Sequence, residues 1–231
     1  MNIRSLVFAA LVSGVAAFAG DEIPTSMGPI LGFGFGDGSD AAFQVRFASN
    51  LALGDSVINL TNAGGSSTLS GLTAASAPTF AQNGDICANI YAYSPDEQLV
   101  SCCSCNVTPN GLNSLSVKND LASNTLTPII PSALVIKLLA TEGGAKCTAN
   151  KAATVTSHEL EVGLLAWGTT IHALPTSPVS YDVVETKFSA PVLTKAELAR
   201  MTQLCAFIRA NGSGYGICKS CKVGGLGAAS K

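Results

Sequence analysis

Short runs in which apolar and polar residues alternate, separated by turn residues, dominate the chain from residue 42 to residue 188. Such runs predict half-buried strands, because successive side chains of a strand point to opposite faces of its sheet. We expect strands at 42–47, 56–61, 86–93, 98–103, 111–117, 133–139, 163–174 and 181–188. Short strands joined by turns favour an antiparallel β-sandwich over alternating strands and helices. The expected fold is therefore mainly β.

One segment near the carboxyl terminus has the period of a helix. Thr194 and Glu197 match a capping box, in which each side chain satisfies a free backbone N–H of the first turn. The sequence Asn211-Gly212 matches a helix stop. The apolar residues between them fall on one face: Leu198, Met201, Leu204, Cys205 and Ile208. We expect a sandwich that is stapled by disulfides and a helix at 195–210 that closes one end of it. A disulfide from Cys205 would attach the helix.

The amino terminus predicts a secretory signal peptide at 1–19. A cationic start at residues 1–4 precedes an apolar run at 6–18, which ends in the small-x-small sequence Ala17-Phe18-Ala19. About 13 apolar residues are too few to cross a bilayer, which takes ~20. We expect cleavage before Gly20, secretion to the extracellular space or the cell surface, and no membrane span after cleavage.

A glycine-rich arm at 20–40 follows this cleavage site. Within it, residues 30–36 (ILGFGFG) alternate apolar side chains with glycine, which places Leu31, Phe33 and Phe35 on one face of an extended strand. The spacing G-x-G-x-x-G of phosphate-binding loops is absent. The segment suits strand addition to another copy, and the alternatives are an edge strand of its own domain or a linker. We expect one sandwich domain at 41–222 and a flexible tail at 223–231.

Composition narrows the class of protein. The chain has 231 residues, of which 47% are hydrophobic and 12% are charged, with 13 Lys and Arg against 15 Asp and Glu. Disordered chains combine low hydrophobicity with high charge, so disorder is excluded as the main state. A nucleic-acid surface needs clustered Lys and Arg, which this chain lacks, so we expect no nucleic-acid partner.

Export determines how the eight cysteines are interpreted: Cys87, Cys102, Cys103, Cys105, Cys147, Cys205, Cys218 and Cys221. An even number in an oxidising compartment favours four structural disulfides. Cys102 and Cys103 are adjacent, so in a strand they point to opposite faces and find different partners. Cys205, Cys218 and Cys221 are plausible partners for the cluster at 102–105, although eight cysteines leave the connectivity open.

Two C-x-x-C spacings leave other chemistry open. Cys102, Cys105, Cys218 and Cys221 could form a four-thiolate zinc set, but more than a hundred residues separate the two pairs. A redox motif at 218–221 would need a helix after it, and the sequence that follows is Lys-Val-Gly-Gly-Leu-Gly. Structural disulfides are the interpretation we adopt, with no metal ligands.

Candidate catalytic groups are few. The two histidines, His158 and His172, stand outside any hydrolase, metalloprotease or catalytic-cysteine motif. We therefore expect no enzyme, no catalytic residues and no cofactor. Three asparagines begin Asn-x-Ser/Thr triplets, which are glycosylation acceptors where the source makes that modification: Asn59, Asn106 and Asn211.

Two distinctive segments, 94–111 (SPDEQLVSCCSCNVTPNG) and 197–221 (ELARMTQLCAFIRANGSGYGICKSC), resemble a group of uncharacterised secreted bacterial proteins that contain cysteines. They cover a minor part of the mature chain. The group has no known activity, so the resemblance implies bacterial export and a cysteine-stapled domain, and no functional residue is carried over from it.

These observations favour a secreted structural or interaction protein, such as a subunit of a cell-surface or extracellular fibre. Its partners would be other copies of itself, joined by strand addition through Leu31, Phe33 and Phe35. The alternative is a secreted binding module, for example for surface glycans, in which Tyr91, Tyr93 and Trp167 stack on sugar rings. A secreted enzyme is a distant third.

Overall fold

The computed structural model describes residues 42–64, 84–174, 181–219 and 221–223. The predicted signal peptide at 1–19 and the arm at 20–40, with Leu31, Phe33 and Phe35, lie outside the described residues. So does the predicted tail at 223–231, except for its first residue.

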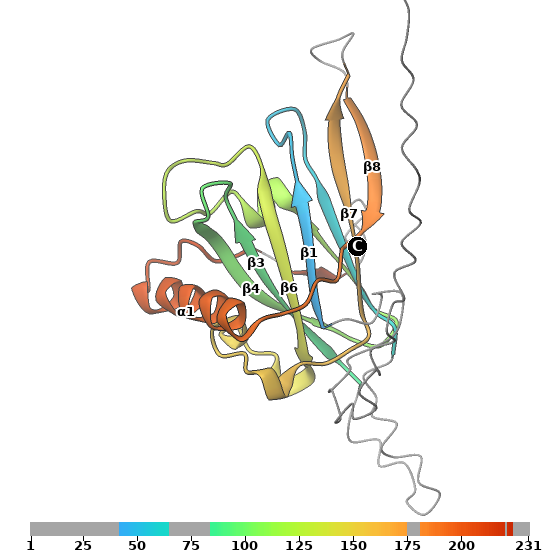
Figure 1. The fold of residues 1–231 in the computed structure, drawn as a ribbon, viewed down its shortest axis with the longest axis vertical. Helices are drawn as coiled ribbons and strands as arrows, with labels where there is room; N and C mark the ends of the chain where they lie inside the picture. The colour runs from blue at the N-terminus through green and yellow to red at the C-terminus, as the bar shows by residue number, and fades with distance from the viewer. Residues whose placement is uncertain (1–41, 65–83, 175–180, 220, 224–231) are drawn as a thin grey trace, which may run out of the picture. The chain divides into compact units, whose positions relative to one another are not determined.

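Two antiparallel sheets form the fold (Figure 1). The four-stranded sheet has the order β1-β6-β3-β4, and the five-stranded sheet has the order β8-β7-β2-β5-β9. The first sheet contains β1 (Phe43–Ala48), β6 (Leu134–Glu142), β3 (Ile86–Tyr93) and β4 (Leu99–Val107). The second contains β8 (Tyr181–Lys187), β7 (Leu164–Ala173), β2 (Val57–Asn62), β5 (Leu112–Ser116) and β9 (Lys222–Val223). This arrangement confirms the prediction of a mainly β, antiparallel sandwich.

β3 lies between β6 and β4 in the four-stranded sheet, and all eight of its residues are buried. Its even-numbered side chains, such as Ile86 and Ile90, join the core between the two sheets. Its odd-numbered side chains, such as Tyr91 and Tyr93, join a second apolar cluster on the outer face of the four-stranded sheet. Both faces are covered, so the strand is mostly apolar, as strands buried on both sides usually are, and its buried Asn89 is hydrogen-bonded.

The helix α1 (Lys195–Asn211) covers this outer face (Figure 1). Leu198, Met201, Cys205 and Ile208 pack in the same cluster as Tyr91. The helix therefore has the predicted bounds to within one residue, but the prediction that it closes one end of the sandwich is wrong. The physical reason is that the outer face of the four-stranded sheet is apolar and needs a cover.

The ends of α1 follow the sequence signals in part. The hydroxyl of Thr194 accepts a hydrogen bond from the N–H of Glu197 at 3.1 Å, and Gly212 ends the helix with a φ of 67°. The carboxylate of Glu197, however, pairs with Lys137 of β6. The reciprocal half of the predicted capping box is thus replaced by an ion pair that ties the helix to the sheet.

Four short helical turns complete the described structure: η2 (Val117–Leu121), η3 (Gly144–Lys146), η4 (Lys151–Ala153) and η5 (Ser157–Glu159). Ala152 of η4 belongs to the cluster under α1. No helix within the described ranges is long and apolar enough to cross a membrane.

Candidate functional site

The edges of the two sheets differ in how far the described chain covers them. On β1, the N–H of Val45 donates to the carbonyl of Ser189 at 2.7 Å and the N–H of Ser189 donates back at 3.0 Å. On β4, the N–H of Cys102 donates to the carbonyl of Gly216 at 3.0 Å. On β5, Ser114 pairs with Lys222 of the two-residue strand β9. Later segments of the chain thus lie along each of these strands.

β8 is the exception. It pairs with β7 on one side, and no other described residue pairs with its second side. All seven residues of β8 are exposed, including the apolar Tyr181, Val183 and Val184 at 43%, 51% and 46%. An unpaired strand with apolar side chains is a template for pairing with another strand, so β8 is the candidate interaction edge.

The hydrogen-bond pattern tells which residues of β8 face outward. The N–H of Phe188 donates to the carbonyl of Ala166 on β7 at 2.9 Å. In an antiparallel pair, residues that bond to the partner strand alternate with residues whose N–H and C=O point away. The register is continuous through β8, so Val184 bonds to β7, whereas Val183 and Glu185 direct their backbone groups to the free edge.

The inner face of β8 is also incompletely covered. Phe188 belongs to the core between the sheets, but Val184, two alternate positions along the same face, is 46% exposed. Val184 is therefore accessible at the edge of its sheet, on the side where β1 is the edge of the other sheet.

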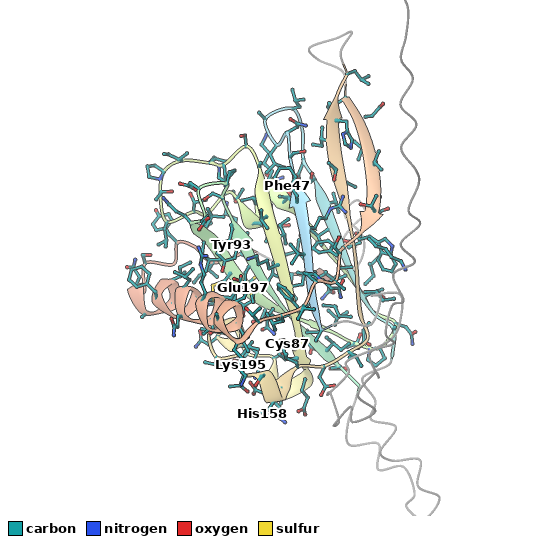
Figure 2. The ribbon with its side chains drawn as sticks, in the orientation of Figure 1. Phe47, Cys87, Tyr93, His158, Lys195 and Glu197 are labelled. Atoms are coloured by element: carbon teal, nitrogen blue, oxygen red, sulfur yellow. A yellow bond between two sulfur atoms is a disulfide. The ribbon has the colours of Figure 1, made fainter. Side chains whose placement is uncertain are left out.

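A groove of about 450 Å³ lies between β1 and β8 on this side. Its apolar lining includes Val45 and Phe47 of β1, and Phe47 is 54% exposed (Figure 2). By the same alternation, Phe47 directs its backbone N–H and C=O outward, as Val45 does where it pairs with Ser189. The groove thus combines apolar and polar side chains with outward-directed backbone groups that no described residue is shown to bind.

Arg46 connects the two sheets at the base of this groove. Its guanidinium donates to the carbonyl and hydroxyl oxygens of Thr186 at 2.8 and 2.7 Å and to the hydroxyl of Thr170 at 2.7 Å. Burial lowers the pKa of Arg46, and the negative charge of Glu185 opposes this effect. The side chain keeps β1 and β8 at a fixed separation.

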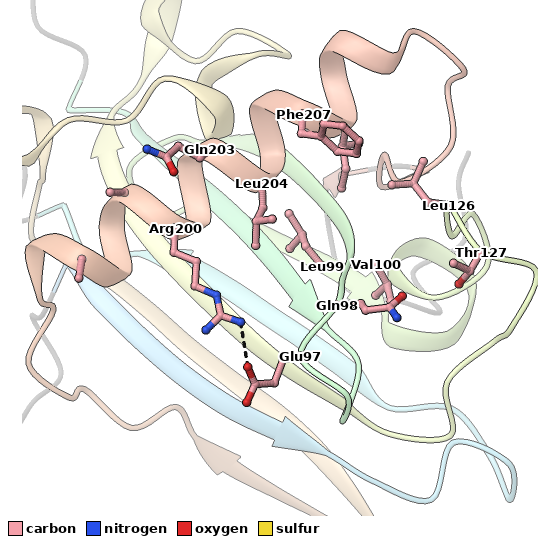
Figure 3. A pocket seen from close by; sticks show the side chains of 13 residues that line it. Glu97, Gln98, Leu99, Val100, Leu126, Thr127, Arg200, Gln203, Leu204 and Phe207 are labelled. Atoms are coloured by element: carbon pink, nitrogen blue, oxygen red, sulfur yellow. Dashed lines mark hydrogen bonds and ion pairs between the residues drawn. The ribbon is translucent and has the colours of Figure 1, made fainter.

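A second groove, of about 720 Å³, runs between α1 and the connection from β3 to β4 (Figure 3). Leu99, Leu204 and Phe207 give it an apolar lining. At one end Arg200 pairs with Glu97 at 3.0 Å. This groove lacks a free strand edge comparable to β8, so we treat it as secondary.

Four disulfides connect all eight cysteines, as the sequence predicted: Cys87–Cys147, Cys102–Cys205, Cys103–Cys218 and Cys105–Cys221. The adjacent Cys102 and Cys103 do have different partners. Cys102 lies in the outer cluster and binds the helix, whereas Cys103 and Cys105 lie in the core between the sheets. The zinc set suggested by the two C-x-x-C spacings is therefore not assembled, because Cys102 points to the wrong face.

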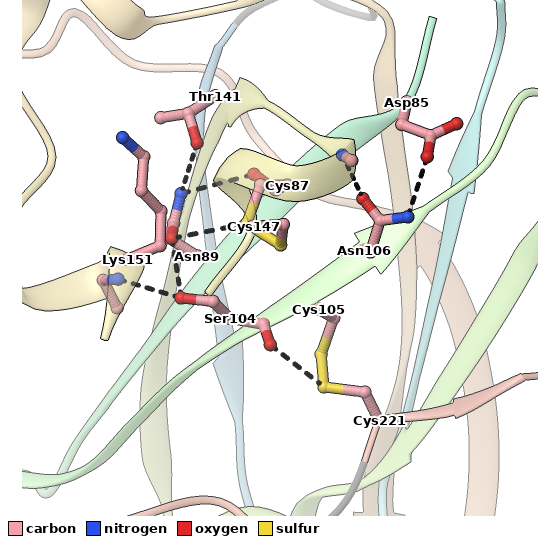
Figure 4. The surroundings of a disulfide bond; sticks show 12 residues. Asp85, Cys87, Asn89, Ser104, Cys105, Asn106, Thr141, Cys147, Lys151 and Cys221 are labelled. Carbon is pink, nitrogen blue, oxygen red and sulfur yellow. Dashed lines mark hydrogen bonds between the residues drawn. A yellow bond between two sulfur atoms is a disulfide. The ribbon is translucent and has the colours of Figure 1, made fainter. Parts of the chain in front are cut away.

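A buried polar network surrounds Cys87–Cys147 (Figure 4). The amide of Asn89 donates to the carbonyl of Leu139 and the hydroxyl of Thr141, both at 3.0 Å, and accepts from Ser104 at 2.8 Å. These bonds satisfy a fully buried amide, which would otherwise be costly. We assign the network a structural role, because its polar groups bond to one another.

Lys151 and Glu159 form a partly buried ion pair next to this network. The ammonium group of Lys151 donates to the carboxylate of Glu159 at 2.6 Å. This bond is the main reason that the pKa of Glu159 lies below its ordinary value. The pair closes the turns η4 and η5 against the sheet.

Several residues that the sequence suggested do not form a site. His158 and His172 are both exposed and belong to η5 and β7, so the structure does not bring them together. Tyr91 and Tyr93 are buried, which raises the pKa of both phenols, and the hydroxyl of Tyr91 donates to the carbonyl of Ala152. The prediction that these two tyrosines stack on sugar rings is therefore wrong. The third aromatic residue of that prediction, Trp167, is half-buried on β7.

The triplet asparagines also differ in position. Asn59 donates to Glu185 and Asn106 donates to Asp85, whereas Asn211 is exposed at the end of α1.

Comparisons with protein-family models, with curated proteins and with solved structures found no match for this chain.

Proposed function

We propose that this is a secreted structural protein whose copies assemble by strand addition. The arm of one copy, with Leu31, Phe33 and Phe35, would pair with the free edge of β8 in the next copy. The observation that carries the proposal is β8 itself, whose seven residues are exposed and whose second side has no partner within the described residues.

The chemistry of the two segments is complementary. Strand addition takes its affinity from backbone hydrogen bonds and its specificity from alternate side chains that fill pockets. β8 supplies outward backbone groups at Val183 and Glu185, and the groove supplies the apolar side chains of Val45 and Phe47 beside polar ones. Each phenylalanine buried there would contribute about 1.5–3 kcal/mol.

The geometry of donation favours a filament. The donor arm and the acceptor edge are different surfaces of the same chain, so each copy can accept one arm and donate another. Such head-to-tail contacts continue indefinitely unless the rotation between copies closes a ring. A fibre subunit is the function that this arrangement supports best.

Secretion is supported by the disulfides. Four disulfides in one chain of this size are typical of proteins that leave the reducing cytosol. The predicted signal peptide at 1–19 would provide the export route. Amino-terminal sequencing of the exported protein should give a start at or near Gly20.

The proposal is tested by removing the donor. We expect wild-type mature protein to sediment as assemblies and to form filaments in negative-stain microscopy. Deletion of residues 20–38, or the double substitution Phe33→Asp and Phe35→Asp, should give folded monomers. The matched control is Ser26→Asp with Ser39→Asp, which adds the same charge at polar positions of the arm and should still assemble. Assembly of the arm-deleted protein would contradict the proposal.

A further inference from the structure

Two of the disulfides lie side by side. Cys103 and Cys105 are two residues apart on β4, on the face that points into the core, and bind Cys218 and Cys221. The sulfur atoms of Cys103, Cys105 and Cys221 lie within 4.8 Å of one another, and the sulfur of Cys218 is bonded to that of Cys103. Three of the four sulfur atoms thus lie together, and the fourth is one bond away from one of them.

Four thiolates are a ligand set that Zn²⁺ prefers for structural sites, in tetrahedral geometry with Zn–S distances of about 2.3 Å. We propose that the reduced protein binds one Zn²⁺ through Cys103, Cys105, Cys218 and Cys221. Oxidation and metal binding are then mutually exclusive states of the same four sulfur atoms.

The chemistry balances with a phosphine as reductant. Two phosphines and two water molecules convert the two protein disulfides to four thiols, and each phosphine takes up one oxygen atom to become a phosphine oxide. Binding of Zn²⁺ then releases the four protons, because thiolate and not thiol is the ligand. The resulting centre carries two negative charges, and a lysine follows Cys218 and Cys221 in the sequence, at 219 and 222.

The zinc site would join the segment that contains Cys218 and Cys221 to β4, as the two disulfides do. Gly216 lies along the first sheet, where it bonds to Cys102, and Lys222 lies along the second, where it pairs with Ser114. The carboxyl-terminal closure of the sandwich would therefore persist in a reducing environment.

The other cysteines provide matched controls. Cys102 points to the opposite face of β4 and binds Cys205 of the helix, and Cys87 binds Cys147 beyond the end of β3. We expect neither pair to contribute a zinc ligand.

The test uses the full-length mature protein, reduced without oxygen with a phosphine, loaded with zinc sulfate and passed through a desalting column. We expect one zinc per chain in the wild type, in Cys87→Ser with Cys147→Ser, and in Cys102→Ala with Cys205→Ala. We expect loss of stoichiometric zinc in Cys103→Ser with Cys105→Ser and in Cys218→Ser with Cys221→Ser. Cobalt in place of zinc should give the intense visible absorption of tetrahedral thiolate coordination in the first three proteins.

Circular dichroism keeps the test decisive if reduction unfolds the chain. Adding zinc to the reduced wild type should then restore its near-ultraviolet spectrum. Adding zinc to the reduced variant Cys103→Ser with Cys105→Ser should not restore the spectrum of that variant. The proposal is overturned if the reduced wild type retains no zinc, or if it retains zinc equally well after removal of Cys103 and Cys105. Neither result depends on whether the protein assembles into filaments.

Discussion

Arg46 and Gly168 depend on each other at the base of the groove between β1 and β8. A Cβ atom on Gly168 would lie 2.6 Å from both Cδ and Nε of Arg46, which is closer than non-bonded atoms approach. Three hydrogen bonds to Thr170 and Thr186 hold the arginine in place. Glycine is therefore required by the position of the side chain that crosses the sandwich.

We predict that Gly168→Ala lowers the free energy of unfolding by about 1–3 kcal/mol, the usual cost of overpacking. In an Arg46→Ala background the obstacle is gone, and the penalty of Gly168→Ala should disappear. Urea unfolding of the two single variants and the double variant gives the coupling energy. Additive effects would show that the two residues do not constrain each other.

The ion pair of Lys151 and Glu159 gives a prediction about pH. Glu159→Gln should cost about 1 kcal/mol at neutral pH, at the low end for a charged hydrogen bond because the carboxylate is partly exposed to water. The pKa of Glu159 is lowered in the folded protein, so its contribution is present above its ordinary pKa of 4.5 and is lost as the pH falls through the lower folded value.

The difference in unfolding free energy between wild type and Glu159→Gln should therefore be constant at neutral pH and vanish in acid. Burial raises the pKa of the nearby Glu161, which has the opposite effect, but this contribution is common to both proteins and cancels. Urea titrations from about pH 7 to about pH 2 measure the difference. A difference that persists in acid would contradict the assigned cause.

At the scale of elements, local sequence patterns predict where the strands lie in the chain, but not which elements pack against them in space. The strand at 86–93 and the helix starting at residue 195 were clear from alternation and from the cap at Thr194. The placement of the helix over Tyr91 was not, because a strand buried on both faces has no polar side to indicate its cover. The two-residue strand β9 is too short for any periodic signal.

The sequence predicts a donor segment, which stays a prediction, but it does not predict the acceptor edge on β8. The alternation at Leu31, Phe33 and Phe35 suggested a donor strand from sequence alone. The acceptor could not be predicted, because the exposure of β8 depends on which strands lie beside it in space. The sequence does carry one signal that β8 is an edge strand, because edge strands commonly carry charges. These charged residues are Asp182, Glu185 and Lys187.

The helix should depend on its disulfide. Replacing Cys102 and Cys205 by Ala should lower the free energy of unfolding by about 2–5 kcal/mol and release α1 from the sheet. Hydrogen exchange at helix amides near Met201 should then increase more than exchange in β3. Replacing Cys87 and Cys147 should also lower stability but leave the protection of the helix unchanged. Equal effects on the helix would contradict this assignment.

The outward backbone of β8 gives a sharper prediction. Val183→Pro removes an N–H that points to the free edge, so the protein should fold with nearly normal stability but fail to assemble. Val183→Ala shortens the same side chain but keeps the N–H, and it should assemble. Val184→Pro removes a hydrogen bond to β7 instead, and it should lower the melting temperature more than Val183→Pro. Sedimentation and thermal unfolding measure both effects.

At the scale of the whole fold, the two sides of the sandwich are closed differently. On the side of β4 and β5, Gly216 bonds to β4, Lys222 pairs with β5, and two disulfides hold Cys218 and Cys221 to β4. Where β1 and β8 form the edges, Ser189 covers one position of β1 and β8 has no cover within the described residues. Under the proposed function, another copy would close this second side.

The most direct measurement mixes two defective proteins. Deletion of residues 20–38 leaves an acceptor edge without a donor, and Val183→Pro leaves a donor without an acceptor edge. Each should sediment alone as a monomer, and an equimolar mixture should form a heterodimer that grows no further, because only one productive contact remains. A mixture that stays monomeric, or either protein assembling alone as wild type does, would contradict strand addition from the arm to β8.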